Sequence, residues 1–533
     1  MAKPAVSRRR GDKKASRPAE EKRRHTRLPC SHAATLTLGS WPRRRTLPVQ
    51  AVDFSSAGAR VTLSPDAGIE AGQRVYLNCA SPHDPPGTRP HRLAATVVSS
   101  AGADIGLRFE RHVGEQADAA TTRRGRSAAL AVAIILALLM CLIKVSHLHR
   151  FWYASWVQLY SLLTCTFLIS RMVISSFYRE PEDNNYRPSV SIVIAVMNEE
   201  ACIVRTVEGC LRSRYPADRL EVIVVDDGST DGTWRELTAL RARRPSVKLL
   251  QFEKNRGKRH AMAAGIGIAT GEVLLFVDSD STPDPEGVYR LVQPLADPSV
   301  GAVSGHVEVI VEEHNLISKM ESVRYYLGHR FIKGAESLFG AVSCCPGPFS
   351  AYRRDAVLKI LDGWLNQRFM GVPATFGDDR SLTLRILRDY RVLFHFGARC
   401  RTTVPDRWLP FFKQQLRWKK SWMRELPYAM RTMCAEHPVA AFSYAAGAII
   451  TLLSPLVLFY SLIYLPLYAG AQPVYYVLGF LASYVCLSLV CYYQTGTPVW
   501  FYGPLSGAVY MCVMVWQNYY AILTINKTAW GTR

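Results

Sequence analysis

The chain has 533 residues, of which 49% are hydrophobic and 20% charged, and a formal net charge of +22. This length leaves room for several domains. The charge is uneven, because lysine and arginine dominate residues 1–27 while the last hundred residues are nearly uncharged. No motif that reads nucleic acid follows the basic tail, so we expect the charge to mark the cytoplasmic side of a membrane and exclude a nucleic-acid partner.

Short runs of alternating hydrophobic and polar residues follow the tail. They are separated by glycine, proline, serine and aspartate and predict a small β domain, with strands over residues 34–38, 59–63, 74–78, 93–98 and 105–109. Arg23 and Arg27 directly precede the first run, and arginines at this spacing can clamp phosphates and stack on purines. Asp53-x-Ser55-x-x-Gly58, expected between strands, can bring a carboxylate and backbone donors to a guanine edge.

The order of these patterns, with a closing strand over residues 106–109, resembles the PilZ domain, the bacterial receptor for cyclic di-GMP. The resemblance implies a β-barrel over residues 23–112, preceded by a disordered basic tail over residues 1–22 and followed by a linker over residues 113–126. The residues implied to bind cyclic di-GMP are Arg23, Arg27, Asp53, Ser55 and Gly58. The alternative is a basic tail ahead of an unrelated β-barrel.

Two apolar segments, residues 127–143 and 152–170, come next. A membrane crossing takes roughly 20 residues, so we expect two transmembrane helices within residues 127–175. Arginines lie on both outer sides of the pair: Arg123, Arg124 and Arg126 before it, and Arg171, Arg179 and Arg187 after it. By the positive-inside rule, residues 1–126 and the block after residue 180 are both cytoplasmic.

The block from residue 188 to residue 300 alternates between strand and helix patterns. Strands are predicted over residues 190–195, 220–225, 247–252 and 272–277, and a helix over residues 199–212. Such alternation predicts a mostly parallel sheet covered by helices. Ligands bind beyond the carboxyl ends of strands in such sheets, and the acidic motifs fall at those ends.

Three motifs in this block suit a nucleotide diphosphate. Asp226-Asp227 follows the second strand and can hydrogen-bond a nucleoside. Asp278-x-Asp280 follows the fourth strand, and two such carboxylates can bind a hard divalent cation that bridges a diphosphate. Between them, residues 255–260 place Lys258 and Arg259 on a turn that a glycine permits, which suits phosphate contact.

A second set of motifs lies ahead of the C-terminal apolar region. Gly377-Asp378-Asp379-Arg380 supplies paired carboxylates, and Gln414-Gln415-Leu416-Arg417-Trp418 supplies polar, cationic and flat aromatic groups. Residues 406–436 carry apolar and cationic residues, as helices lying on a membrane surface do. Trp418 could therefore be an interfacial anchor, a sugar-stacking platform, or both.

Residues 438–526 contain no aspartate, glutamate, lysine or arginine. At roughly 20 residues per crossing they form three or four passes. Three spans are evident, over residues 440–466, 473–493 and 501–523, whereas a cytoplasmic C-terminus after Lys527 requires an even number. Two readings would reconcile these counts, and the sequence leaves both open: a break of the first span at Pro455, or one re-entrant segment.

The order of the motifs resembles the processive family 2 glycosyltransferases with the GT-A fold, and specifically the group of hyaluronan synthases and rhizobial chitin-oligosaccharide synthases. The matching stretches are residues 344–353, 366–373, 377–383, 398–400, 404–405, 413–421 and 530–533. The resemblance implies a GT-A domain over residues 180–405, a transmembrane channel segment over residues 437–526 and a C-terminal Trp-Gly-Thr-Arg motif within residues 527–533. The N-terminal module departs from the usual pattern of that group.

The resemblance also implies a role for each motif in an inverting transfer from a UDP-sugar. Asp379 is the expected general base with Asp378 in support, and Asp280, helped by Asp278, holds Mg²⁺ or Mn²⁺. The expected donor contacts are Asp226 and Asp227 with uridine, Lys258, Arg259 and Asp278 near the phosphates, and Gln414, Gln415 and Arg417 over the diphosphate. Trp418 stacks on the acceptor sugar, and Trp530 and Arg533 shape the closed site.

The function expected from all of this is that of a multi-pass enzyme of the bacterial inner membrane, with its catalytic and N-terminal domains in the cytoplasm. It would polymerise and export a hyaluronan- or chitin-like polysaccharide from UDP-GlcNAc, alone or alternating with UDP-GlcA, under activation by cyclic di-GMP. Two alternatives stay open. One is an enzyme that makes short chito-oligosaccharides or transfers single sugars to lipid, and the other is a cyclic di-GMP sensor with an inactive transferase domain.

Overall fold

The computed structural model describes residues 28–38, 45–55, 58–62, 69, 73–79, 91–101, 104–109, 128–139, 142, 155–312, 314–470 and 474–527. The chain divides into two compact units, Met1–Ser127 and Ala128–Arg533, and each is described by itself. The expected tail and linker, Arg23, Arg27, Trp530 and Arg533 lie outside the described residues.

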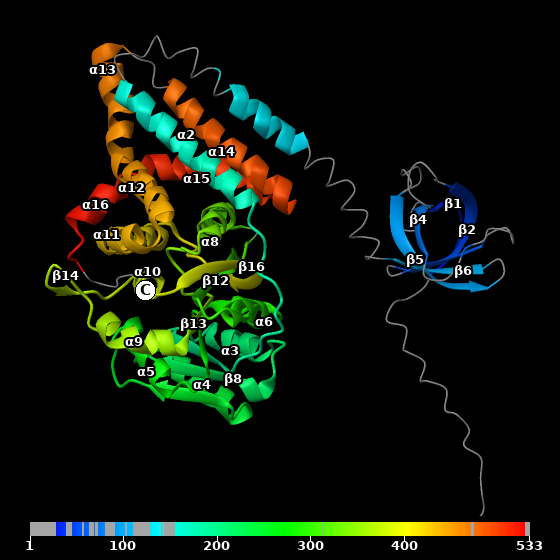
Figure 1. Ribbon diagram of the computed structural model, residues 1–533, viewed down its shortest axis with the longest axis horizontal. Coiled ribbons are helices and arrows are strands. Elements are labelled where there is room, and N and C mark those ends of the chain that lie inside the picture. The colour runs from blue at the N-terminus through cyan, green and yellow to red at the C-terminus, as the bar shows by residue number, and fades with distance from the viewer. Residues whose placement is uncertain are drawn as a thin grey trace, which may run out of the picture. The chain divides into compact units, whose positions relative to one another are not determined.

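The first unit contains a closed six-stranded barrel. Its strands are β1 (Leu28–Leu38), β2 (Arg45–Ser55), β3 (Gly58–Thr62), β4 (Arg74–Cys79), β5 (His91–Ala101) and β6 (Asp104–Phe109). They pair antiparallel in the order β1-β2-β3-β6-β5-β4 (Figure 1). Alternate residues point inward, so that Leu36, Val61, Leu77, Val97 and Leu107 form a shared buried core.

Strand β2 is absent from the strands that the sequence predicts. Its sequence contains Pro48 and lacks a clean alternation of apolar and polar residues, yet it pairs with both β1 and β3. The Asp53-x-Ser55-x-x-Gly58 motif, expected between strands, therefore occupies strand residues. Asp53 and Ser55 lie in the last three positions of β2, and Gly58 opens β3 opposite Ser55.

The second unit carries long apolar helices. Four described segments are long and apolar enough to cross a membrane: Leu159–Ser176, Pro438–Ala469, Tyr476–Thr495 and Pro498–Leu523. Ahead of them, the described helix in the first predicted span, Ala128–Leu139, is shorter than a full crossing. After the catalytic block, the described residues contain the three spans that are evident in the sequence, and Pro455 lies inside an unbroken helix.

Several shorter elements make up these segments. They are α2 (Ser155–Ser176), α12 (Pro438–Phe459), η5 (Tyr460–Tyr464), α13 (Leu465–Ala469), α14 (Val474–Thr495), η6 (Pro498–Tyr502), α15 (Gly503–Val509), η7 (Tyr510–Met514) and α16 (Gln517–Leu523).

An eight-stranded sheet forms the centre of the second unit. Its strands are β7 (Val190–Val196), β8 (Leu220–Asp226), β9 (Val247–Gln251), β10 (Val273–Phe276), β11 (Ser281–Pro283), β12 (Val300–Val309), β13 (Ser350–Arg353) and β16 (Arg391–Thr402). Their order is β11-β16-β12-β13-β10-β7-β8-β9. Strands β10, β7, β8 and β9 run parallel, as do β12 and β16, whereas β13 and β11 are antiparallel to their neighbours.

Helices cover both faces of this sheet. They are α3 (Ile203–Leu211), η2 (Ala217–Arg219), α4 (Thr233–Arg243), α5 (Lys258–Ile268), α6 (Gly287–Val292), η3 (Gln293–Ala296), α7 (Leu316–Leu327), η4 (Gly328–Lys333), α8 (Gly334–Leu338), α9 (Arg354–Leu365), α10 (Asp378–Leu387) and α11 (Trp408–Glu436). A small hairpin, β14 (Arg368–Phe369) and β15 (Val372–Pro373), follows α9.

The strands are hydrophobic on both faces because both faces are buried. Side chains of β7 and β8 alternate between two cores: Val193 and Ile223 face α5, α9, α10 and α11, whereas Ile192 and Val224 face α3, α4 and α6. In Figure 1, α11 lies between α10 and the apolar helix α12. Helix α11 thus connects the helices that cover one face of the sheet with the apolar helices.

Candidate active site

The first acidic motif lies at the carboxyl end of β8. Asp226 is the last residue of the strand and Asp227 follows it, and both are buried. Asp226 accepts hydrogen bonds from the backbone N–H of Ser229 at 3.2 Å and from Gln251 Nε2 at 3.3 Å. Asp227 accepts from the backbone N–H groups of Arg256 at 2.7 Å and Gly257 at 2.9 Å, although burial raises its pKa. Asp227 thus ties the strand end to the basic turn.

The basic turn continues into helix α5. Gly257, whose φ is +95°, precedes the helix and gives the turn a conformation that side chains disfavour. The Lys258 ammonium forms an ion pair with Asp278. Burial disfavours that charge, but the carboxylate of Asp278 outweighs burial and raises the pKa of Lys258. Lys258 therefore lies at the Asp-x-Asp motif, where a diphosphate contact is expected.

The structure does not support the predicted phosphate contact of Arg259. Its side chain is 3% exposed and points away from the turn, because the second residue of α5 faces the interior of the domain. Arg259 Nε donates to Asp378 Oδ1 at 2.7 Å, and Arg259 Nη1 donates to the backbone carbonyl of Trp364 at 2.9 Å. The guanidinium is instead a buried partner of the second acidic pair.

The Asp-x-Asp motif follows β10 and is partly exposed. Asp280 accepts hydrogen bonds from the hydroxyls of Ser281 at 3.2 Å, Thr402 at 3.4 Å and Thr403 at 3.2 Å. Burial, and next the negative charge of Asp278, raise the pKa of Asp280. The motif therefore concentrates negative charge and oxygen atoms in one place.

A divalent cation fits this set of donors. Mg²⁺ and Mn²⁺ prefer oxygen ligands, and Asp278 and Asp280 supply two carboxylates. Among the described residues no group of three or more histidine, cysteine, aspartate or glutamate side chains could hold a metal alone. A cation here would need further oxygens from a bound diphosphate and from water, as is usual for Mg²⁺.

The second acidic pair opens helix α10. Gly377, with φ at +79°, precedes it, and a Cβ at this position would lie 1.9 Å from Ser421 Oγ of helix α11. Only glycine therefore lets the two helices approach this closely. Asp378 is buried, and its backbone carbonyl accepts from Trp364 Nε1 at 3.1 Å.

Asp379 differs from its neighbour because it is partly exposed. Its Oδ1 accepts from the backbone N–H of Arg380 at 2.8 Å, and Cys344 Sγ lies 3.8 Å from its Oδ2. Burial raises the pKa of Cys344 to about 11, so this neighbour is a neutral thiol. Of the two carboxylates, Asp379 is the one that a substrate can reach.

One face of helix α11 joins the two acidic regions. Arg417, Trp418 and Ser421 recur at a spacing of three to four residues and share that face. The charge of Arg417 is attracted to Asp278, Asp379 and Asp378, although burial lowers its pKa. Arg417 therefore lies within electrostatic reach of both the Asp-x-Asp motif and the second pair.

Trp418 is 36% exposed, so part of its ring is free for stacking. Its ring centre lies 6.4 Å from that of Tyr325, and the guanidinium carbon of Arg324 lies 5.6 Å from it. Burial and the carboxylate of Glu321 raise the pKa of Tyr325, and smaller contributions from Asp280 and Asp278 act in the same direction.

The two glutamines of this motif differ in exposure. Gln415 is 3% exposed and packs inside the helix interface, so its predicted contact with the diphosphate does not fit its burial. Gln414 is only partly buried. Within the described part of the chain, Gln414 Oε1 and Gln415 Nε2 are buried atoms without a hydrogen-bond partner.

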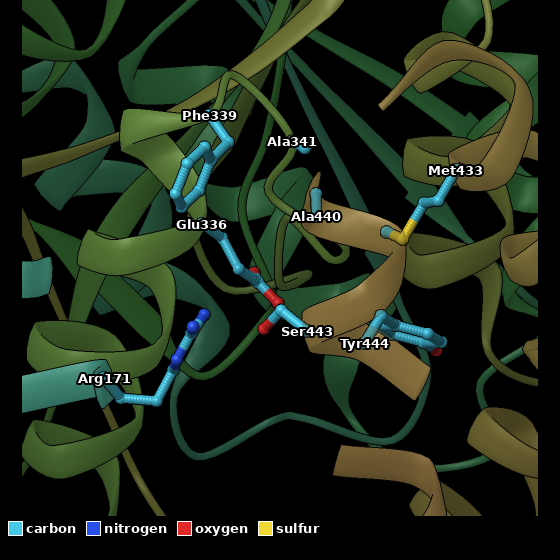
Figure 2. Close-up of a pocket in the computed structure, with 8 residues that line it drawn as sticks. All are labelled: Arg171, Glu336, Phe339, Ala341, Met433, Ala440, Ser443 and Tyr444. Atoms are coloured by element: carbon cyan, nitrogen blue, oxygen red, sulfur yellow. The ribbon is translucent and has the colours of Figure 1, made fainter. Parts of the chain in front are cut away.

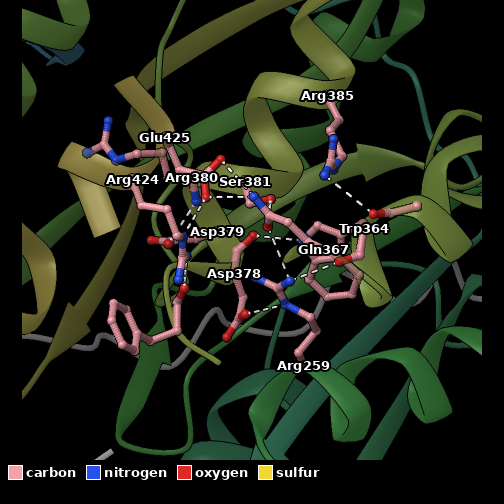
Figure 3. Close-up of polar contacts among 12 residues, drawn as sticks. Arg259, Trp364, Gln367, Asp378, Asp379, Arg380, Ser381, Arg385, Arg424 and Glu425 are labelled. Carbon is pink, nitrogen blue, oxygen red and sulfur yellow. Dashed lines mark hydrogen bonds and ion pairs between the residues drawn. The ribbon is translucent and has the colours of Figure 1, made fainter. Parts of the chain in front are cut away.

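Several polar residues around the site have no role in the sequence prediction. Gln367, Arg424 and Glu425 surround the Arg259–Asp378 pair (Figure 3). A signal for two of them exists, because Arg424 and Glu425 continue the three-to-four-residue spacing that begins at Arg417 and Trp418. Gln367 lies in the matching stretch 366–373, but that match assigns it no role, since its partners are distant in sequence.

A small cavity of about 10 Å³ lies between the apolar helices and the catalytic domain (Figure 2). This is about the room needed for one water molecule. Its lining residues are Arg171, Glu336, Phe339, Ala341, Met433, Ala440, Ser443 and Tyr444. Glu336 accepts hydrogen bonds from the backbone N–H and the hydroxyl of Ser343, the residue before Cys344, so the cavity adjoins the loop beside Asp379.

Comparison with known proteins identifies both units. The family model "Glycosyl transferase family 2" matches residues 191–361, and the model "PilZ domain" matches residues 21–123. A hyaluronan synthase of Streptococcus pyogenes serotype M3 is 29% identical over 415 residues, which cover 75% of this chain and 97% of the synthase. An N-acetylglucosaminyltransferase of Rhizobium meliloti is 36% identical over 272 residues, which cover 49% of this chain and 62% of that protein.

Among solved structures, a mannosyltransferase from Pyrobaculum calidifontis in complex with GDP-Man and Mn²⁺ is 24% identical. The match covers 72% of this chain and 99% of that chain, with a TM-score of 0.46.

These findings confirm the predicted family and fold class. The barrel of the first unit is a PilZ domain, and the helix-covered sheet with acidic motifs at its strand ends is a GT-A catalytic domain within a protein of several apolar helices. The chain therefore carries a family 2 glycosyltransferase domain, an N-terminal PilZ domain and helices long and apolar enough to cross a membrane, and it is similar to a hyaluronan synthase and an N-acetylglucosaminyltransferase.

Proposed function

We propose that the protein is a processive, inverting polysaccharide synthase that uses a UDP-sugar as donor and exports its product. The observation that carries the proposal is that adjacent residues at the start of α5 bind both acidic motifs: Lys258 pairs with Asp278, and Arg259 pairs with Asp378. The start of one helix thereby ties a diphosphate-binding motif to the acidic pair that carries the accessible carboxylate of Asp379, in a protein with helices long enough to cross a membrane.

On the donor side, Asp226 and Asp227 contact the uridine, and Lys258 and Arg417 face the diphosphate. Asp278 and Asp280 hold Mg²⁺ or Mn²⁺, which when bound neutralises charge on the leaving diphosphate. Lys258 already pairs with Asp278, so its ammonium lies where phosphate oxygens would gather. Gln414, at the start of the same helix face, completes the cover over the diphosphate.

On the acceptor side, Asp379 removes the proton from the hydroxyl at the non-reducing end of the growing chain. A general base must lie within hydrogen-bond reach of that proton, and Asp379 is the exposed member of its pair. Asp378 forms an ion pair with Arg259 and helps to hold the turn that carries Asp379. The partly exposed ring of Trp418 offers a face on which the acceptor sugar stacks.

Polar contacts that join α7 and α11 to the apolar helices are consistent with export of the product. Lys319 Nζ lies 3.4 Å from Tyr502 Oη, Tyr326 donates to Gln494 at 2.9 Å, and Lys419 donates to Asn518. Polar side chains within or beside membrane helices often mark substrate paths. Flanking arginines in the sequence favour apolar helices in the inner membrane and a catalytic domain on its cytoplasmic side. The polysaccharide would therefore leave the cell through these helices.

The PilZ domain supports control by cyclic di-GMP. Asp53 and Ser55 at the end of β2, together with Gly58 at the start of β3, form one end of a hairpin. With Arg23 and Arg27 they would bind the guanine edges and phosphates of the dinucleotide, and binding would activate transfer.

A panel of UDP-sugars tests this function. The purified full-length protein is incubated with UDP-GlcNAc, UDP-GlcA and both together, with and without cyclic di-GMP, and UDP release is measured. We expect release with UDP-GlcNAc, alone or with UDP-GlcA, to rise when cyclic di-GMP is added, and to lose that rise in the Asp53→Ala variant. If no donor gives UDP release, the proposed enzymatic activity is refuted. If UDP release is the same with and without cyclic di-GMP, the proposed activation is refuted.

A further inference from the structure

A cluster of buried and partly buried polar side chains lies around the second acidic pair. Its members, here called the anchoring cluster, are Arg259, Gln367, Asp378, Arg424 and Glu425. They come from helix α5, from the segment after α9, from the start of α10 and from helix α11. Figure 3 shows these side chains converging on one another from separate elements.

Gln367 lies at the centre of this cluster. Its Oε1 accepts hydrogen bonds from Arg259 Nη1 at 3.2 Å and from Ser381 Oγ at 2.6 Å. Its Nε2 donates to both carboxylate oxygens of Glu425, at 2.8 and 3.1 Å. One amide therefore bonds simultaneously to α5, α10 and α11.

Further hydrogen bonds extend this link to Asp378, to Glu425 and to the turn at Gly377. Arg259 Nε binds Asp378 at 2.7 Å. Arg424 Nε binds Glu425 at 3.1 Å, and Arg424 Nη2 donates to the backbone carbonyl of Phe376, directly before Gly377. The turn that presents Asp379 is thus held from both sides.

The chemistry of the cluster requires an amide at position 367. Two guanidinium groups face two carboxylates, so the charges balance without a further ion. Only an amide can accept from Arg259 and Ser381 while it donates to Glu425. A carboxylate at position 367 would face that of Glu425 across a buried contact, and an apolar side chain would leave buried polar groups unpaired.

We propose that Gln367 and Glu425 are positioning residues for sugar transfer. Glu425 lies two helical turns after Trp418 on α11. The Gln367–Glu425 contact therefore fixes the acceptor platform of Trp418 relative to the turn that carries Asp379. A misplacement of about 1 Å between reacting groups can cost about 100-fold in rate. The inference rests on the proposed function and adds the residues that align its two reacting partners.

The ratio of UDP released to sugar incorporated into polymer tests the proposal in the full-length protein. In Gln367→Ala the acceptor is misaligned while water can still attack the donor, so we expect incorporation to fall by about 10- to 100-fold and the ratio to rise. UDP affinity, measured by calorimetry, should stay within about threefold, because the side chain of Gln367 bonds to Arg259, Ser381 and Glu425 and not to Asp226, Asp227 or Lys258.

Gln293→Ala is the matched control. Gln293 is a buried glutamine that bonds to the backbone of Tyr186 and Tyr289, away from the cluster. We expect this variant to lower both UDP release and incorporation in proportion, with an unchanged ratio. An unchanged ratio in Gln367→Ala as well would show a merely structural role and overturn the proposal.

An exchange of the two side chains guards against a variant that fails to fold. Gln367→Glu alone brings two carboxylates together, and we expect it to lose incorporation by about 100-fold or more. Gln367→Glu combined with Glu425→Gln restores one donated hydrogen bond between the two positions with the donor reversed, and the carboxylate at position 367 still accepts from Arg259 and Ser381. We expect it to recover incorporation to within about tenfold of the unaltered protein. A double variant no better than Gln367→Glu would contradict the proposal. If the unaltered protein makes no polymer from any donor, the proposed function fails instead, which the panel of donors reveals separately.

Discussion

The two halves of the site are held by different kinds of contact. On the donor side, carboxylates at strand ends bind the backbone of nearby turns: Asp226 bonds to Ser229, three residues away, and Asp227 to Arg256, 29 residues away. On the acceptor side, side chains bind one another across long stretches of sequence, 119 residues between Arg259 and Asp378 and 58 between Gln367 and Glu425. Donor geometry is thus a property of the sheet, whereas acceptor geometry depends on how helices α10 and α11 pack.

The largest expected effect is on the acceptor half alone and comes from Asp379→Asn. Asp379→Asn keeps the shape of the acceptor half but removes its base, so we expect incorporation to fall by about 1,000-fold or more. UDP affinity, set by the donor half, should change by less than about threefold. Calorimetry with UDP and incorporation of a labelled sugar measure the two. Retained polymer synthesis would refute the role of Asp379.

Asp280→Ala is expected to impair the metal site of the donor half. The change removes one of two metal-binding carboxylates, and we expect turnover to fall by about 100-fold or more because the leaving diphosphate loses its counter-charge. The dependence of UDP binding on Mn²⁺ should weaken as well, whereas Asp379→Asn should leave it intact. Equal Mn²⁺ dependence in Asp280→Ala and the unaltered protein would rule out this ligand.

A smaller effect is expected from Trp418→Ala. Loss of one stacking face costs roughly 1 kcal/mol, which corresponds to about fivefold in binding of the acceptor chain. We expect shorter products, sized by gel filtration, with UDP affinity preserved. Trp408→Ala is the matched control, because Trp408 begins the same helix, is 41% exposed and stacks on Phe412. If both variants shorten the product equally, Trp418 acts as a membrane anchor and not as a platform.

The smallest effect at neutral pH concerns a buried histidine of strand β12. His306 is buried among Phe394, Phe396 and His329, and burial lowers its pKa to about 3 from an ordinary value of 6.5. The unfolded chain therefore binds one more proton between pH 6.5 and 3. His306 thus makes the free energy of unfolding fall with decreasing pH, by up to about 1.4 kcal/mol per pH unit.

His306→Phe removes this titration and tests it. Thermal unfolding of the full-length protein should change little at pH 7.5, since the ring volume is similar. Between pH 6.5 and pH 4 the variant should lose less stability than the unaltered protein. Parallel losses in both proteins would assign the acid sensitivity to other groups.

Much of the fold can be predicted from this sequence, because the informative contacts are local. The strands around Asp226 and Asp278 follow from short buried runs that end in acidic residues. Strand β2 escapes prediction because Pro48 and an irregular pattern obscure a strand that is stabilised by pairing on both sides.

The acceptor half is less predictable for the same physical reason. Arg259 lies beside Lys258 in a basic turn, and the sequence cannot tell that the two side chains diverge, one to Asp278 and the other to Asp378. The burial of Gln415 and the central place of Gln367 arise only when α9, α10 and α11 come together. Motif spacing predicts which segments form the site, whereas long-range packing decides which of their side chains face the substrate.

The length of the product made by the purified full-length protein tests the central claim most directly. The protein is supplied with labelled UDP-GlcNAc, alone and with UDP-GlcA, in the presence of cyclic di-GMP, and the labelled material is sized at early times. A processive synthase should yield long chains while most donor remains unused. Products of only a few sugars, or label transferred singly to lipid, would contradict the account.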